Sequence, residues 1–289
     1  MMATCSRRRW SQWLLVGTTA ACAAAAAAVL LGILGVVFAK GLPAIDWAFL
    51  TEAMRDSGLS GGILYHLMGS AILVGAALLI AVPLAAAFAL VHEVYLPASR
   101  LRSSLDTALY LLNGMPSILF GIVGFLVFVK TFGWGKSWLA GSFVLALMML
   151  PTITVSMMER IRQIPRAQIA AAHGLGLRRE QVVWSIVVPQ SAGGLLTGSL
   201  LGLARAAGET APILFTAAVF SGATVPAGIR DSPVLALPYH IFVMAQDSLS
   251  PESGPRLWAT AAVLLTLVFA LSALSLPLRL RLRSRSRDA

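Results

Sequence analysis

The sequence predicts an all-α protein that crosses a membrane six times, and three observations support this fold class. Of the 289 residues, 58% are hydrophobic and only 12% are charged, whereas roughly 25% are charged in an ordinary soluble domain. The mean hydropathy is +0.82, so the chain has more apolar surface than a soluble fold of this length could bury. Six apolar stretches are each long enough to cross about 30 Å of hydrocarbon as a helix.

The six expected spans are joined by short connections, which leave no room for a separate soluble domain. They cover residues 13–39, 63–91, 108–129, 138–158, 192–220 and 257–278. A seventh apolar run, 234–246, is too short to span and predicts a re-entrant or interfacial helix. The expected organisation is a tail at 1–12, a six-span transmembrane domain at 13–278 that includes the loop 160–189, and a basic tail at 279–289.

The first span follows a basic cluster, Arg7, Arg8 and Arg9, and contains an unbroken alanine run at 23–28. This arrangement imitates a signal peptide, but the apolar run exceeds the usual core of roughly 7–15 residues and a second span follows. We therefore expect an uncleaved signal anchor. Alanine is the strongest helix former, so the alanine run is compatible with a spanning helix.

Basic residues gather on one side of the expected spans. That side holds Arg7, Arg8, Arg9, Arg100, Arg102, Arg160, Arg162, Arg166, Arg178, Arg179, Arg279, Arg281, Arg283, Arg285 and Arg287. Because short cytoplasmic loops carry an excess of Lys and Arg, both termini and the loop 160–189 are expected in the cytoplasm. The excess of arginine on this side accounts for the whole net charge of +10, so nothing in the charge indicates a nucleic-acid partner.

Ser60 precedes the second span within Gly58-Leu59-Ser60-Gly61, a glycine-flanked serine that resembles the nucleophile motif of rhomboid intramembrane proteases. A serine nucleophile needs a base, and none of the expected spans after the second contains a histidine, while His66 in the second span is too near in sequence to be that partner. Glycines that form a loop and a helix cap explain the same residues. A rhomboid-like protease is therefore the weaker alternative.

No cofactor or metal site is expected on this chain. Gly135-Lys136-Ser137 resembles the end of a phosphate-binding loop, but Lys130 stands where that loop needs a glycine. The two cysteines and four histidines are too scattered for a four-ligand metal site.

The third expected span contains Asn113-Gly114-Met115-Pro116. Proline lacks an N–H and clashes with the preceding turn, so the helix is expected to be interrupted there. Non-helical backbone at membrane depth is tolerated where it lines a cavity. Asn113 is therefore a candidate pathway residue, although an ordinary helix kink explains the same residues.

The loop between the fourth and fifth spans predicts a compact helix-turn-helix. Pro165 is typical of a helix start, and Gly176 is typical of the left-handed turn that ends a helix. A second helical run is expected to end near Pro189. The first helix carries small alanine side chains, which permit close approach by a partner protein.

This loop resembles the coupling loop of ABC importer permeases, whose pattern is Glu-Ala-Ala, three residues, Gly, nine residues, Ile, any residue, Leu, Pro. The matching residues are Ala170-Ala171-Ala172, Gly176 and Ile186-Val187-Val188-Pro189. The coupling loop docks on the ATPase in that family, so the resemblance implies ATPase coupling through Ala170, Ala171, Ala172 and Gly176. The chain departs from the pattern at Ala170, where the family commonly has Glu, and at Val188, which replaces Leu.

The fifth expected span carries Arg205 and Glu209 near its middle, where each charge costs about 2.5–3.5 kcal/mol on insertion scales. The two residues are four positions apart and can pair on one helix face. They are nearly in line with a stripe of small residues at Gly194, Gly198, Gly202 and Ala206, so we expect them to face packed protein. A structural ion pair and a substrate pathway both explain them.

Three further motifs resemble the phosphate ABC transporter permeases. They are Ala204-Arg205-Ala206-Ala207-Gly208-Glu209-Thr210-Ala211-Pro212, Asn113-Gly114-Met115-Pro116-Ser117-Ile118 and Ala236-Leu237-Pro238. The Gly-Glu-Thr-Ala-Pro ending and the third motif favour the PstA type over its PstC-type partner. The resemblance covers nearly the whole chain from Gly41 and implies the ABC importer permease (MetI-like) fold. It also implies a phosphate importer of the bacterial inner membrane, in which this chain is a transport subunit and not an enzyme.

The resemblance implies a set of partners. They are a second permease subunit of the PstC type, an ATPase dimer that binds ATP, a periplasmic phosphate-binding protein, phosphate and membrane lipid. Arg205, Glu209 and Asn113 are then the substrate-pathway candidates, because a planar guanidinium can bind phosphate oxygens bidentately. The remaining alternative is a secondary transporter of an anion, which usually has further midplane ionisable residues or an internal repeat. Neither further midplane ionisable residues nor an internal repeat is evident in the sequence.

Overall fold

The computed structural model describes residues 2–55, 58, 60–222, 225–246 and 253–285, and most of them are helical. The α-helices are α1 Met2–Gly41, α2 Trp47–Thr51, α3 Leu64–Leu90, α4 Arg100–Gly114, α5 Ser117–Gly124, α6 Trp138–Arg162, α7 Arg166–Gly174, α8 Arg179–Val182, α9 Val188–Ala207, α10 Ala211–Thr216, α11 Leu237–Gln246 and α12 Ser253–Arg285. A 3₁₀ turn covers Leu42–Ala44, and π-helical turns cover Val91–Tyr95, Phe125–Thr131 and Val183–Val187. The short strands β1 Met54–Arg55 and β2 Ser60–Gly61 pair antiparallel.

The described part of the chain has five helices that are long and apolar enough to cross a membrane. They run Leu15–Ala44, Leu64–Tyr95, Trp138–Arg162, Arg179–Ala207 and Gly254–Ala273. A bent helix pair makes a sixth span if the pair is counted as one. The protein is therefore an all-α, multi-pass membrane protein, as predicted. The terminal helices also extend into the expected tails, because α1 begins at Met2 and α12 continues to Arg285.

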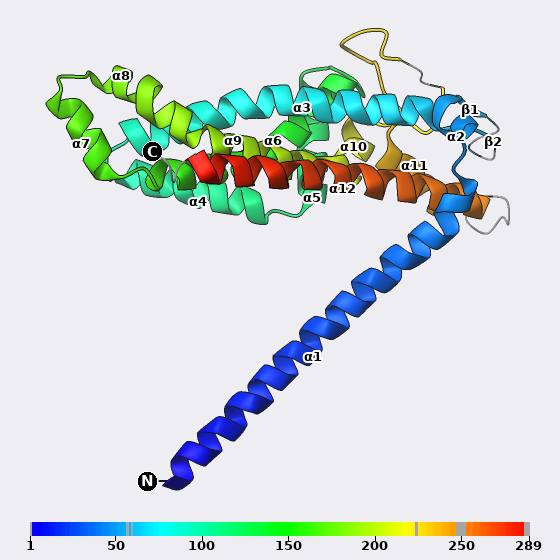
Figure 1. The fold of residues 1–289 in the computed structure, drawn as a ribbon. Coiled ribbons are helices and arrows are strands. Elements are labelled where there is room, and N and C mark those ends of the chain that lie inside the picture. The colour runs from blue at the N-terminus through cyan, green and yellow to red at the C-terminus, as the bar shows by residue number, and fades with distance from the viewer. Residues whose placement is uncertain (1, 56–57, 59, 223–224, 247–252, 286–289) are drawn as a thin grey trace.

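The long helices form a bundle from which α1 diverges (Figure 1). α1 contacts the rest of the chain near its end, where Gly41 lies against Trp258 and Ala262 of α12. The centre of the bundle is formed by α3, α6 and α9, and α12 packs against α9. Most of the length of α1 is therefore free to face lipid or another protein.

The glycine stripe of α9 is a packing surface against α6. A Cβ added at Gly198 would lie 2.8 Å from Ile153 Cα and 3.1 Å from the Ile153 carbonyl oxygen. These are backbone atoms of the neighbouring helix, so the two helices would have to separate. Small residues at helix interfaces allow such close approach inside a membrane.

Gly198→Leu is accordingly expected to destabilise the bundle. Overpacking a well-packed core typically costs about 1–3 kcal/mol, and here the clash is with backbone, so we expect a cost at the upper end. Gly32→Leu in α1 is the matched control, since nothing lies within 4 Å of a Cβ at that position. Thermal unfolding in detergent would measure both variants, and equal stability would contradict this account of the packing.

The third expected span is broken, as Pro116 predicts. α4 ends at Gly114, and Pro116 precedes the first residue of α5. The axes of the two helical segments differ by 101° across the break. The segment 108–129 is therefore a bent pair of helices and not one continuous span.

The fifth expected span, 192–220, was misplaced at both ends. Its helix begins earlier, because α8 runs through the π-helical turn Val183–Val187 into α9. The helix does not end near Pro189, which lies inside the continuous helix directly after the π-helical turn, where the regular α-helical hydrogen bonding is already interrupted. The helix instead ends at Ala207, with Gly208 as its cap, and the short α10 follows.

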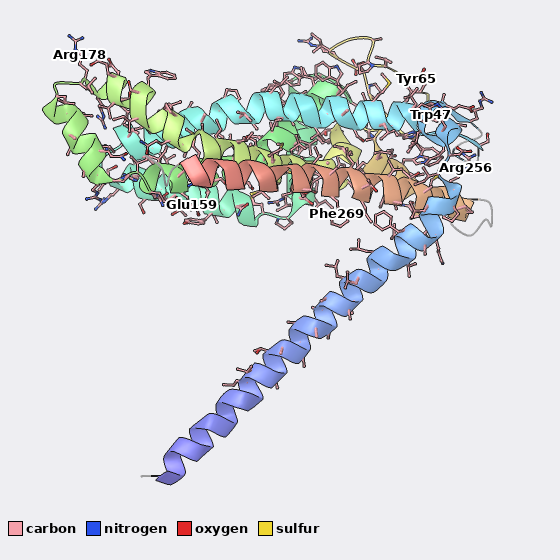
Figure 2. The ribbon with its side chains drawn as sticks, in the orientation of Figure 1. Trp47, Tyr65, Glu159, Arg178, Arg256 and Phe269 are labelled. Carbon is pink, nitrogen blue, oxygen red and sulfur yellow. The ribbon has the colours of Figure 1, made fainter. Side chains whose placement is uncertain are left out.

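The two ends of the bundle carry different elements. One end has α2, β1, β2 and α11, and the other has α7, α8 and the C-terminal end of α12 (Figure 1). We call the second end the hairpin end; Figure 2 shows Arg178 there and Trp47 and Arg256 at the opposite end. The predicted short helix is confirmed as α11, whose Leu237 N–H donates to Ser70 Oγ of α3 at 2.9 Å.

Candidate functional site

Arg205 lies about halfway along the bundle. The preceding turn of α9, at Gly202, contacts Met149, which is near the midpoint of α6. The helix is capped by Gly208 shortly after Arg205. Glu209 therefore lies in the connection between α9 and α10, and not within a continuous fifth span.

The three predicted pathway residues come together at this point. Arg205 Nη1 donates to Asn113 Oδ1 at 3.4 Å, and Arg205 Nε is 3.6 Å from Glu209 Oε1. Asn113 is in the last turn of α4, directly before the break at Pro116. The end of α4 and the end of α9 thus meet in one polar cluster, defined by Arg205, Glu209 and Asn113.

The polar cluster faces outward from this chain, which corrects the expectation that the charged pair faces packed protein. The Arg205 side chain is 40% exposed and that of Glu209 is 17% exposed, and Asn113 is exposed. Arg205 is only about 20° around the helix from Gly198, but its long side chain extends to the open side. Its neighbour one turn earlier, Leu201, is also exposed.

A groove of about 510 Å³ continues from the cluster toward the hairpin end. It is lined by Ser156, Glu159, Arg160, Gln163, Gly194, Thr197 and Leu201. α6 and its C-terminal cap supply Ser156, Glu159, Arg160 and Gln163, and α9 supplies Gly194, Thr197 and Leu201. Leu201 lies one turn from Arg205 and joins the groove to the polar cluster. We call the cluster and the groove together the α9 strip.

Arg205 is only loosely held by its partners. Charge-assisted N–H···O contacts are ordinarily about 2.7–2.9 Å long, whereas the Asn113 and Glu209 contacts measure 3.4 Å and 3.6 Å. A guanidinium has five N–H donors, so most of them remain available to an anion on the open side. The long contacts argue against a tight structural ion pair. They are compatible with an arginine that binds and releases an anion.

The predicted helix-turn-helix is confirmed at α7 and α8. Pro165 precedes α7, and Gly176 has a φ of +80°, the left-handed conformation expected for the turn. The exposed members of the predicted coupling set are Ala170, Ala171 and Gly176. Ala172 is 5% exposed and faces its own chain. Leu175, which no sequence pattern singled out, is 84% exposed beside the turn.

A buried carboxylate joins three helix ends beneath the hairpin, and the sequence analysis missed it. Glu93, in the π-helical turn after α3, has a 6% exposed side chain. Its Oε1 lies 2.6 Å from Arg162 Nη2 of α6, and its Oε2 lies 2.7 Å from Arg102 Nη2 of α4. Arg162 is 69 residues away in the sequence, so no local spacing reveals the group. These contacts fix α3, α4 and α6 where the hairpin emerges.

Residues 81–284 match the family model of the binding-protein-dependent transport system inner membrane component. The match covers more than half of the chain. The chain belongs to this family. Curated relatives of this inner-membrane component include the phosphate transport system permease protein PstA 2 of Mycobacterium bovis, 33% identical over 242 residues, with 83% of this chain and 77% of the relative covered. The phosphate transport system permease protein PstA of Haemophilus influenzae is 30% identical over 240 residues, with 83% of each chain covered.

Solved structures show the same fold for this inner-membrane component. A chain of the bacterial alginate ABC transporter, solved in complex with a pentasaccharide-bound periplasmic protein, has a TM-score of 0.59 at 15% identity, covering 98% of this chain and 96% of that one. A chain of the inward-facing MetNI methionine ABC transporter has a TM-score of 0.57 at 13% identity, covering 76% and 97%. These likenesses confirm the predicted ABC importer permease fold.

Membership of the family also decides between the function classes. The curated relatives are transport permeases, which confirms that this inner-membrane component is a transport subunit and not an enzyme. The rhomboid-like protease and the secondary transporter therefore find no support.

Proposed function

We propose that this chain is the permease subunit of an ATP-driven inorganic phosphate importer, with Arg205 in the translocation pathway. The proposal rests on the loosely paired guanidinium at mid-depth on an open face. A charge at that depth is costly against lipid, so protein or an aqueous path has to cover it. Phosphate presents oxygens that a guanidinium can bind in pairs. The names of the curated relatives support phosphate as the substrate.

Each residue of the polar cluster has a role in this proposal. Arg205 replaces part of the water that phosphate loses on entering the bundle. Glu209, 3.6 Å from the arginine, lowers the affinity for the anion so that it can leave again. The Asn113 amide accepts from Arg205 and holds the guanidinium at the break in the third span. The groove of the α9 strip then provides a polar path for the anion toward the hairpin end.

The proposed assembly supplies what this chain lacks. A second permease of the PstC type covers the α9 strip, so that the pathway lies between the two subunits. The α7–α8 hairpin docks on an ATPase dimer, which binds and hydrolyses ATP outside this chain. A periplasmic phosphate-binding protein delivers phosphate at the opposite end. The chain lies in the inner membrane of a bacterial cell with both termini in the cytoplasm, and the hairpin end faces the ATPase.

Reconstitution tests the proposed function directly. Liposomes that contain the two permeases and the ATPase are expected to accumulate radioactive phosphate when ATP and the binding protein are both supplied. Sulfate is the control anion, because it has a similar shape and charge. Accumulation of sulfate but not phosphate would overturn the assigned substrate, and accumulation without ATP would overturn the coupling.

The proposed orientation predicts opposite labelling at the two ends of the bundle. In a background with Cys5→Ser and Cys22→Ser, a membrane-impermeant maleimide is expected to label Trp47→Cys in spheroplasts. Gly176→Cys should react only after the membrane is opened. Both positions are exposed in the structure, so access from one side is what the experiment compares. Strong labelling at position 176 from outside would contradict the docking of the hairpin on an ATPase.

A further inference from the structure

A second basic site lies away from the polar cluster, beneath the α7–α8 hairpin. It is a cavity of about 580 Å³ between the hairpin and the ends of α3, α4 and α6. Its titratable lining residues are Arg102, Arg162, Arg166, Arg179, His173 and Glu93. The other lining residues are valines and isoleucines. With a neutral histidine, four arginines and one carboxylate give this lining a net charge of +3.

The single carboxylate of the cavity already contacts two of the four arginines. Glu93 Oε1 contacts Arg162 at 2.6 Å and His92 Nδ1 at 3.1 Å, while Oε2 contacts Arg102 at 2.7 Å. Another acid, Asp106, lies 4.0 Å from Arg162 but does not line the cavity. Glu93 is thus already paired with two arginines, and its ion pairs do not include Arg166 or Arg179.

Those two arginines both belong to the hairpin. Arg166 opens α7 and Arg179 opens α8. The Arg179 guanidinium lies 4.7 Å from the centre of the Tyr95 ring, which fixes its position at the cavity wall. Within the described residues, neither arginine has a carboxylate within 4 Å. Their fixed positive charges repel one another and the Arg102 and Arg162 pair, so an anion between them would lower the energy of the site.

We infer that this cavity binds a phosphate group. Guanidinium side chains from α7 and α8 can each donate two parallel N–H bonds to phosphate oxygens, and the valine and isoleucine wall suits an apolar attachment beside the phosphate. Two sources have this chemistry. One is inorganic phosphate on the hairpin side of the membrane, and the other is the headgroup of an anionic phospholipid in the adjacent leaflet, where basic pockets between helices bind such headgroups.

Occupation of the cavity would tie the hairpin to the bundle. The anion would bridge Arg166 and Arg179 on the hairpin to Arg102 and Arg162, which are already fixed to the bundle through Glu93. Binding at the cavity does not depend on Arg205 or on the transported substrate. Any effect on transport rests on the proposed function, because it requires the hairpin to couple to an ATPase.

Hydrogen–deuterium exchange on the hairpin measures this binding locally. The assembled transporter would be placed in nanodiscs of phosphatidylcholine, with and without inorganic phosphate, and in nanodiscs that contain phosphatidylglycerol. Peptides that cover 166–182 are expected to exchange severalfold more slowly when the cavity is filled. Slowing by inorganic phosphate identifies the free ion, and slowing only with phosphatidylglycerol identifies the lipid. No slowing under either condition would overturn the inference.

Paired variants separate the cavity from general surface charge. Arg166→Gln combined with Arg179→Gln is expected to abolish the slowing, and Arg166→Lys should weaken it because the planar fork is lost. Arg100→Gln combined with Arg178→Gln removes the same charge at the hairpin end without touching the cavity lining, so the slowing should remain. Unchanged exchange in α6 peptides shows that a variant is folded. Slowing that persists in the cavity pair, or disappears equally in the control pair, would reject a specific site.

Discussion

Arg205→Ala is expected to reduce phosphate uptake by about a hundredfold or more while the protein remains in the membrane. Hydrogen bonds to a charged group are worth about 1.5–3 kcal/mol each, and two of them lost from a bidentate contact amount to at least two decades in affinity. The exposed side chain makes only long contacts with Asn113 and Glu209, so its removal takes little packing from the fold. Uptake of radioactive phosphate and membrane abundance would be measured together.

The double variant separates a pathway arginine from a structural ion pair. If Arg205 and Glu209 only hold the chain together, either single alanine variant leaves one charge without its partner, and the double variant should recover folding and part of the transport. For a pathway arginine, Arg205→Ala with Glu209→Ala stays inactive, because the anion then meets no positive charge at mid-depth. Substantial uptake by a normally abundant double variant would reject the pathway role.

Two further variants refine the comparison. Arg205→Lys preserves the charge but not the fork, so intermediate uptake would indicate that attraction matters more than bidentate geometry. Arg100→Ala is the control for loss of an arginine, since that residue is exposed in the first turn of α4 and lies outside the α9 strip. Its uptake should match that of the unmodified transporter.

The fold could be predicted as far as local sequence signals reach. Continuous apolar runs predicted the number and order of the spans, Pro116 the break in the third, and Pro165 with Gly176 the hairpin. The fifth span was misplaced because its apolar run continues to Phe220, while the helix ends where Gly208 and Pro212 interrupt it. Hydropathy averaged over a window depends only on composition, so it does not detect a helix end inside an apolar stretch.

The sequence predicted which residues form the candidate site, but not whether their side chains are buried or exposed. Arg205, Glu209 and Asn113 stood out because polar groups at membrane depth are costly. Helical spacing places Arg205 only about 20° around α9 from Gly198, which indicated a buried pair. A long side chain can turn to either side of its own position, so the spacing does not show that Arg205 extends to the open face. The Glu93 contacts join residues that are far apart in sequence, so only the packed helices reveal them.

Gly176→Val is expected to uncouple ATP hydrolysis from transport without preventing membrane insertion. The glycine has a φ of +80°, a conformation that costs an L-residue roughly 1–2 kcal/mol and a β-branched residue more. Nothing lies within 4 Å of a Cβ built there, so within this chain the change adds only backbone strain. On the outside, the added methyl groups point to where the ATPase is proposed to dock. Copurification of the ATPase and ATP-dependent uptake should both fall.

Two matched variants distinguish strain from bulk at this turn. Gly222→Val introduces a valine at nearly the same φ, +81°, also with nothing within 4 Å, but in the loop at the end opposite the hairpin. It carries the same strain and should still copurify with the ATPase. Gly176→Asn tests the turn itself, because Asn tolerates the left-handed conformation and should retain more coupling than Val. If Gly176→Val assembles and transports as well as Gly222→Val, strain at the turn has no consequence for coupling, and the ATPase docks elsewhere on this chain.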